Sequence, residues 1–446
     1  MTSTRYRRLA TVSLVVAALA LSGCGSSDDS SAQAPPPKAS KPTGQITFWH
    51  FFTDREAEAI QAVVKDFEAA NPGVTVVVKG GQDDEKMRQA ISVGKGPDVG
   101  LSYSTDIVGN FCSTGAWRDL GPWLERDKVD INQLLPIVRA YTEYNGTRCS
   151  MPMLADTYGL YYNKKMLAAA GYDAPPKTLS ELKEMSLKLT KKGADGNIEV
   201  AGFVPSTTYY ENSSAHLAPI FDATWLTPDG KSNLAGDPDW KAMMLWQQDF
   251  ADALGAKEVA KFNAGKGEEF SGDNDFQKGR VAMIMDGEWR VAFLKDQAPD
   301  VDFGTAPFPV PDDQADRYGA GYVTGNIMGI SKGSKNPEAA WALIKYLTLN
   351  TGAIVKLANG IKNVPTTHAA LSSPDLQVDD AFKTFLDVFE NPNSQTSPST
   401  ANGAVYQNQF DAFFQQWERG KVDDLDAGLA KTDQEIDKAL QLGQAP

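Results

Sequence analysis

The order of apolar runs and helical periods between residues 46 and 101 constrains the fold more than any other feature of this sequence. An apolar and aromatic run at 46–51 predicts a buried strand, and the β-branched run at 74–78 is typical of a strand buried on both faces. Apolar side chains recur at helical spacing between these two runs, at Ile60, Val63, Val64 and Phe67. A second helix is expected over 84–92 and a third strand over 98–101. This β-α-β-α-β order predicts a parallel sheet with right-handed crossovers.

The same alternation starts again after residue 151, so the 446 residues are enough for two α/β domains with a core each. The further strands are expected over 158–162, 281–285 and 327–330, and the further helices over 164–170, from 178, over 239–254, from 337 and along the C-terminal stretch. Thr53 with Glu56, and Thr178 with Glu181, have the spacing of helix capping boxes.

The N-terminus has the pattern of an export signal. Arg5, Arg7 and Arg8 precede an apolar run of 13 residues, Leu9 to Leu21, which is too short to span about 30 Å of hydrocarbon as a helix. Leu21-Ser22-Gly23-Cys24 resembles the lipobox of bacterial lipoproteins. That resemblance implies cleavage before Cys24 and attachment of lipid, palmitate included, to this cysteine. Residues 1–23 are thus the predicted signal peptide and 24–44, rich in Ser, Pro and Ala, a flexible tether.

The charge balance bears on the partners. Loss of the first 23 residues removes three positive charges and takes the formal net charge from −14 to −17. Such a chain repels nucleic acid and anionic lipid surfaces. We therefore expect no nucleic-acid partner, membrane contact through the lipid alone, and a location on the outer face of the cytoplasmic membrane. We expect a monomer and no cofactor.

Four segments in the same order resemble the family 1 extracellular solute-binding proteins, the sugar-binding proteins of ABC importers. They are Gly96 to Val99, Tyr161 to Leu182, Phe276 to Trp289 and Gly329 to Ala340. Their order and spacing hold from about residue 45 to 370, whereas the last 75 or so residues match only as generic helices.

The resemblance implies a two-lobed, periplasmic-binding-protein-like α/β fold with mainly parallel sheets flanked by helices and a ligand cleft between the lobes. It assigns 45–154 and 306–350 to lobe 1, and 155–305 and 351–446 to lobe 2. It also implies a function: capture of a sugar, which we expect to be a neutral oligosaccharide, by hinge closure, and delivery to the permease subunits of an ABC importer.

A sugar needs hydrogen-bonding partners for its hydroxyls and aromatic rings for its C–H faces, on loops at the carboxyl ends of strands. Side chains of these kinds follow the expected strands or stand beside the third motif. The candidates are Trp49, His50, Asp54, Tyr103, Ser104, Asp106, Asp156, Tyr158, Asn212, Trp225, Asp286, Glu288, Trp289, Gly321, Tyr322, Asn326, Lys362 and Asn363. Acids and aromatics far outnumber bases among them, which favours an uncharged ligand.

Enzymatic readings have weaker support. Gly329, Ser331 and Gly333 satisfy the Gly-x-Ser-x-Gly pattern, but a nucleophile elbow needs its helix to begin directly after the serine, and Gly333 to Asn336 intervene. No metal-ligand spacing and no P-loop are present. Two alternatives stay open: a carbohydrate-active lipoprotein enzyme with a pair of carboxylates, and a receptor for peptides or amino acids.

The remaining cysteines form an even pair. With Cys24 lipidated, Cys112 and Cys149 are left in an oxidising compartment, where such pairs are usually disulfides. We expect them to be bonded to each other; two buried free thiols are the alternative.

Overall fold

The structure is a computed structural model that describes residues 38–443. The signal-peptide and lipobox predictions, including Cys24, lie outside these residues. Within 38–443, one sheet of eight strands runs through the protein in the order β10-β4-β9-β3-β1-β2, and β7 and β8 also pair with β4. No helix in this part of the chain is long and apolar enough to span a membrane.

The first lobe is built on the strands that the sequence predicts best. β1 (Gly44–Trp49) lies between β2 (Val74–Lys79) and β3 (Val99–Ser102), and both pairings are parallel, as predicted. β9 (Val323–Ile330) completes this part of the sheet antiparallel to β3. The helices around it are α1 (Asp54–Ala70), α2 (Asp84–Ser92), α3 (Val108–Ser113), α4 (Gly121–Arg126), α5 (Pro136–Tyr141), α12 (Pro337–Leu349), α13 (Thr351–Ile361) and α14 (His368–Leu371).

The second lobe surrounds β7 (Met283–Gly287) and β8 (Phe303–Ala306), which both run antiparallel to β4. A small hairpin of β5 (Lys191–Lys192) and β6 (Ile198–Val200) stands apart from the main sheet. The helices of this lobe are α6 (Lys164–Ala169), α7 (Leu179–Leu189), α8 (Ser214–Phe221), α9 (Pro238–Leu254), α10 (Ala256–Ala264), α11 (Arg290–Gln297), α15 (Asp380–Glu390), α16 (Val405–Glu418) and α17 (Leu425–Gly443). The C-terminal helix that the sequence predicts is α17, and its apolar stripe of Leu425, Leu429, Ile436 and Leu440 is buried.

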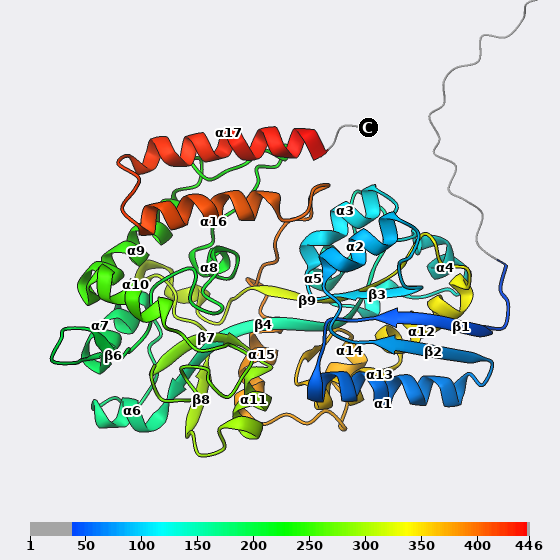
Figure 1. Cartoon of the computed structure of the whole chain (residues 1–446), viewed down its shortest axis with the longest axis horizontal. Helices are drawn as coiled ribbons and strands as arrows, with labels where there is room; N and C mark the ends of the chain where they lie inside the picture. Colours follow the sequence, from blue (N-terminus) through cyan, green and yellow to red (C-terminus); the bar gives the residue numbers. More distant parts are fainter. Residues whose placement is uncertain (1–37, 444–446) are drawn as a thin grey trace, which may run out of the picture. The chain divides into compact units, whose positions relative to one another are not determined.

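One long strand, β4 (Met151–Asn163), belongs to both lobes (Figure 1). Its first half pairs with β9 and with the short β10 (Val364–Pro365), and its second half pairs with β7 and β8. The β4–β9 register shifts between Pro152 and Ala155, as at a β-bulge. The neighbours of β4 and β9 all run antiparallel to them, so the sheet is more mixed than the predicted, mainly parallel one.

The contacts of two segments favour lobe boundaries that differ from the predicted ones. α13 packs against α1 and α12, although its residues fall in the stretch 351–446 predicted for lobe 2. The stretch 307–322, predicted for lobe 1, contacts second-lobe residues: Val310 accepts from the backbone of Leu179, and Arg317 pairs with Asp222 at 2.8 Å. We propose instead that the chain crosses between the two lobes near residue 323 and again after α14.

One capping box is confirmed and the other is wrong. At α7, the Thr178 hydroxyl accepts from the Glu181 backbone, and Glu181 accepts in return from the Thr178 backbone. At α1, Thr53 makes no side-chain cap; its hydroxyl donates to Asp54 instead, over 3.1 Å. Asp54 has a φ of +46°, which turns the chain so that Glu56 faces inward rather than back toward Thr53.

The predicted cysteine pair is a disulfide in the structure. It joins Cys112 of α3 to Cys149, just before β4, with a Cα–Cα distance of 5.4 Å, and it closes a loop of 37 residues. Both ends lie in the first lobe, away from the crossing to the second.

Replacing both cysteines by alanine is expected to lower the free energy of unfolding by about 3–4 kcal/mol, because the unfolded chain regains the freedom that the closed loop removes. Denaturant unfolding followed by tryptophan fluorescence measures the change. The parent chain treated with reductant is the matched control, and its unfolding midpoint should equal that of the double variant. Equal midpoints for oxidised parent and double variant would contradict the prediction.

Candidate binding cavity

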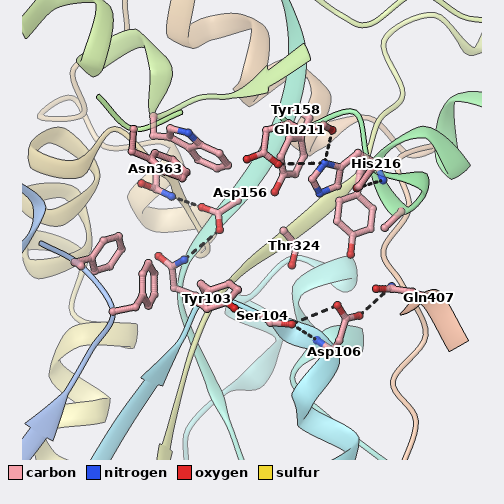
Figure 2. Close-up of a pocket in the computed structure, with 18 of the residues that line it drawn as sticks. Tyr103, Ser104, Asp106, Asp156, Tyr158, Glu211, His216, Thr324, Asn363 and Gln407 are labelled. Carbon is pink, nitrogen blue, oxygen red and sulfur yellow. Dashed lines mark hydrogen bonds and ion pairs between the residues drawn. The ribbon is translucent and has the colours of Figure 1, made fainter. Parts of the chain in front are cut away.

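A cavity of 530 Å³ lies where β4 crosses from one lobe to the other. Its size is within the range of small-molecule sites. Side chains from both lobes line it: Phe51, Phe52, Glu56, Tyr103, Ser104, Asp106, Asp156, Tyr158, Glu211, Ser213, Ala215, His216, Phe270, Trp289, Tyr322, Thr324, Asn326, Asn363, Gln407 and Asp411. Asn363 and Gln407 stand toward opposite ends of it in Figure 2.

The lining follows the ends of the central strands. Phe51 and Phe52 come directly after β1, and Tyr103 to Asp106 directly after β3, so these two loops of a parallel pair meet at one edge of the sheet. β4 and β9 supply the floor through Asp156, Tyr158, Thr324 and Asn326. The second lobe contributes the opposite wall, from α8 and the loop before it, from the stretch after α10, from the residue before α11 and from α16.

Two lining residues directly follow a residue in the left-handed backbone region. Tyr210 has a φ of +47° and precedes Glu211; Lys362 has a φ of +70°, ends α13 and precedes Asn363. Such conformations cost free energy for residues other than glycine and are found where the surroundings impose them, often at functional sites. Here they redirect the chain so that the next side chain enters the cavity.

Asp156 is the polar centre of the floor. Asn326 donates its amide to Asp156 Oδ2 over 3.1 Å, and Asn363 donates to Oδ1 (Figure 2). Because both amides are used as donors, their carbonyl oxygens stay buried without a donor in the described part of the chain. Burial raises the pKa of Asp156, and the hydrogen bonds that it accepts act in the opposite direction, toward the ionised form. This floor offers a ligand unpaired acceptors.

Aromatic rings form two groups on the walls. His216 stacks on Tyr158 with ring centroids 3.7 Å apart, and Trp289 meets Tyr158 edge-on at 5.6 Å. In the first lobe, Phe51 and Tyr103 meet edge-on at 5.4 Å. The pKa of His216 is lowered to about 4 by burial, so its imidazole is neutral near pH 7. The rings therefore provide apolar faces without adding a positive charge.

Carboxyl groups are the only ionisable side chains besides Tyr and His in the described lining, which holds no lysine or arginine. Burial raises the pKa of Glu56 to about 7 and that of Asp106 to about 6. Gln407 reaches Asp106 across the lobes at 3.3 Å. Burial also raises the pKa of Glu211 and of Asp411. A cavity of this kind is poorly suited to an anion and well suited to a donor-rich ligand.

The structure brings about half of the predicted site residues together. Those that line the cavity are Tyr103, Ser104, Asp106, Asp156, Tyr158, Trp289, Tyr322, Asn326 and Asn363. Those that do not are Trp49, His50, Asp54, Asn212, Trp225, Asp286, Glu288, Gly321 and Lys362.

Several residues outside the lining have packing roles. Trp225 is buried in an aromatic cluster with Trp240 and Phe410, at centroid distances of 4.2 and 5.6 Å. His50 is 1% exposed and lies beneath the Gly80 backbone. Trp49 is not part of the cavity lining and carries the Lys79 ammonium over its ring, 5.4 Å from the centroid. None of these can reach a ligand in the cavity without repacking.

The polar residues outside the lining have partners of their own. Asp286 forms a fully buried ion pair with Arg290 at 2.6 Å, and Asn212 donates to the Val204 carbonyl at 2.8 Å. Lys362 donates to the Gln377 carbonyl at 3.0 Å. Asp54 is exposed at the start of α1.

Sequence reasoning missed part of the lining: Phe51, Phe52, Glu56, Glu211, Ser213, Ala215, His216, Phe270, Thr324, Gln407 and Asp411. A signal existed for Phe51 and Phe52, because they stand at the end of the first predicted strand, over 46–51, much as Tyr103 stands just after the third, over 98–101. Gln407 and Asp411 gave none, since they lie on a C-terminal helix whose sequence is that of any amphipathic helix.

The chain matches the sequence profile of the family described as "Bacterial extracellular solute-binding protein" over residues 53–354. It is 25% identical over 402 residues to the maltotriose-binding protein of Pyrococcus abyssi. The aligned residues cover 90% of this chain and 83% of that protein. It is 26% identical over 297 residues to a probable ABC transporter-binding protein of Deinococcus radiodurans, with coverage of 64% and 67%.

The fold is likewise similar to a solved structure. CpMnBP1 with mannotriose bound superimposes with a TM-score of 0.79 at 25% identity, over 88% of this chain and 99% of that one.

Proposed function

The chain belongs to the bacterial extracellular solute-binding protein family, and from this premise we propose that it captures a neutral oligosaccharide and delivers it to the permeases of an ABC importer. The observation that carries the ligand class is the lining of the cavity. It combines aromatic faces with carboxyl and amide acceptors and, among its described residues, includes no lysine or arginine.

Sugar hydroxyls match this lining. Each hydroxyl can donate to a carboxylate or to one of the unpaired Asn326 and Asn363 amide oxygens, while sugar C–H faces pack on rings such as Trp289. A phosphate or carboxylate would instead need an Arg fork or similar donors. The relatives described as binding maltotriose and mannotriose make these two trisaccharides the first probes to use.

The proposed activity is binding without cleavage. Matched family members are described as binding proteins, and the carboxyl groups of the cavity need only accept hydrogen bonds from the ligand. Incubation with each trisaccharide, followed by chromatography of the sugar, separates this proposal from a carbohydrate-active enzyme: intact sugar supports binding and shortened sugar supports hydrolysis.

Trp289→Ala is expected to weaken trisaccharide binding by about 1–3 kcal/mol, roughly 5- to 150-fold in Kd, because ring packing and apolar burial are lost. Isothermal titration calorimetry measures it. Trp49→Ala is the matched control, since it removes an equal, half-buried indole outside the cavity, and it should bind as the parent chain does. Unchanged binding in Trp289→Ala would refute this site.

The proposed mechanism is closure of the two lobes around the sugar. Tyr103 and Asp106 reach the cavity from the first lobe, and His216 and Trp289 from the second, so one ligand contacts both. A ligand shifts the open–closed equilibrium only by its difference in affinity for the two states. Contacts from both lobes supply that difference, and the bulge in β4 offers a place where the crossing strand can bend.

Small-angle X-ray scattering of the chain with and without the bound trisaccharide tests closure. A smaller radius of gyration with sugar is expected, because the ligand stabilises the form in which both walls touch it. A non-binding sugar of equal size serves as the control. The forward scattering also gives the mass, which we expect to be that of a monomer. An unchanged radius at saturation would argue against closure.

We further propose that a lipid on Cys24 and the tether over 24–44 hold the protein at the outer face of the cytoplasmic membrane. The lipobox resemblance and the family's extracellular role support this. Anchoring would raise the effective concentration of loaded protein at the permeases.

Cys24→Ser is expected to move the protein from the membrane fraction to the soluble fraction, because the thiol is the only attachment point proposed for lipid. Fractionation and immunoblotting of cells expressing each form measure it, with Ser22→Ala as a neighbouring control. Membrane association of the Cys24→Ser form would contradict lipid anchoring at this residue.

A further inference from the structure

Glu288 was predicted to touch the ligand, yet the structure places it behind the cavity floor. It follows β7 directly, is fully buried and does not line the cavity. Its Oε2 accepts from the Thr157 backbone at 2.9 Å. Its side chain also forms a hydrogen bond with the carboxyl of Asp156, the polar centre of the floor.

A hydrogen bond between two carboxyl groups requires a proton on one of them, because two carboxylates can only accept. Asp156 already accepts from two amides, from Asn326 and Asn363, which favour its ionised form. Glu288 accepts from a single backbone amide, and its Oε1 has no donor in the described chain. The proton therefore belongs on Glu288.

The surroundings hold no charge that could replace this proton. The charge of Asp156 or Glu288 shifts the pKa of four neighbouring groups, which are Glu56 from α1, Tyr141 from α5, and Tyr158 and Tyr161 from β4. None of these is a cation, and no lysine or arginine of the described residues forms an ion pair with either carboxyl. Two ionised carboxylates in contact inside the protein would repel each other strongly.

We propose that Glu288 is a positioning residue that keeps its proton at neutral pH and donates it to Asp156, so that the pair carries one negative charge, held on the cavity side. With respect to the ligand this rests on the proposed function: the oriented Asp156 carboxylate accepts from a sugar hydroxyl, and the two asparagines keep their free amide oxygens beside it.

The electrostatics of the site are consistent with this assignment. Burial, and next the charge of Asp156, raise the pKa of Glu288 well above that of a free carboxyl. A group whose pKa is raised on folding binds a proton in the folded chain that the unfolded chain has lost. Its contribution to stability is complete below the unfolded pKa of 4.5 and declines as the pH rises through the interval up to the folded pKa.

The experiment compares Glu288→Gln and Glu288→Leu with the parent chain by denaturant unfolding at pH 5, 6, 7 and 8 and by calorimetric titration with maltotriose and mannotriose. Glutamine has the shape of the protonated acid and retains a donor. Leucine has a similar size and no donor. Glu390→Gln, on the exposed end of α15, is the matched control for loss of an ordinary carboxyl.

The expected results have two arms. Glu288→Leu should weaken sugar binding by about tenfold or more, and Glu288→Gln should restore it, because only the glutamine can donate to Asp156. In unfolding, Glu288→Gln should stay folded at least as well as the parent at pH 7. As the pH rises from 5 to 8 it should lose less stability than the parent, by the amount equivalent to one proton, because Glu56 and Asp106 titrate in both chains. Glu390→Gln should follow the parent in both.

Two outcomes would overturn the assignment. One is a Glu288→Gln chain whose stability changes with pH as in the parent. The other is failure of glutamine to restore binding where leucine removes it. The unfolding arm needs no sugar, so if neither trisaccharide binds even the parent chain, the proposed ligand is wrong while the shared proton is still tested.

Discussion

The backbone hydrogen bonding of β4 is the constraint on which both lobes and the cavity depend. From Met151 to Asn163 the strand is paired first with β9 and β10 and then with β7 and β8, and most of it is buried. Buried backbone groups must be paired, so this strand cannot leave either ladder without a large loss of free energy. It fixes Asp156 and Tyr158 at the boundary between lobes, and the other lining residues are placed relative to them.

Local sequence patterns were sufficient for the elements and insufficient for their long-range partners. The runs at β1, β2 and β3 alternate with helical periods, so strand identity and parallel pairing followed from periodicity alone. The capping box at Thr178 is also a local pattern, and it is confirmed. The one at Thr53 is wrong, because the Glu56 side chain lines the cavity instead of returning to Thr53. The proposed assignment of 307–322 to the second lobe rests on contacts such as Arg317 with Asp222, between residues almost a hundred positions apart, which no local pattern encodes.

The same distinction between local patterns and long-range packing explains which site residues could be predicted from the sequence. Residues at strand ends, such as Tyr103 and Asp156, could be found because topology sends strand ends to one edge. Side-chain direction could not: Trp49 and Phe51 are two residues apart, and Trp225 and Trp289 have the same chemistry, yet only Phe51 and Trp289 line the cavity. Asp286 and Glu288 are close to Trp289 in sequence, but both are fully buried outside the cavity lining. Asp286 forms an ion pair with Arg290, and Glu288 forms a hydrogen bond with Asp156.

The position of β9 in the sheet has a consequence for how the chain is made. β9 lies between β3 and β4, but its residues come more than 150 positions after the end of β4 in the sequence. On the ribosome, the first lobe therefore lacks an interior strand until residue 330 has emerged, and domains that fold during synthesis need their whole sequence. The sheet of the first lobe can therefore be completed only late in translation, which suits a protein whose family works outside the cell.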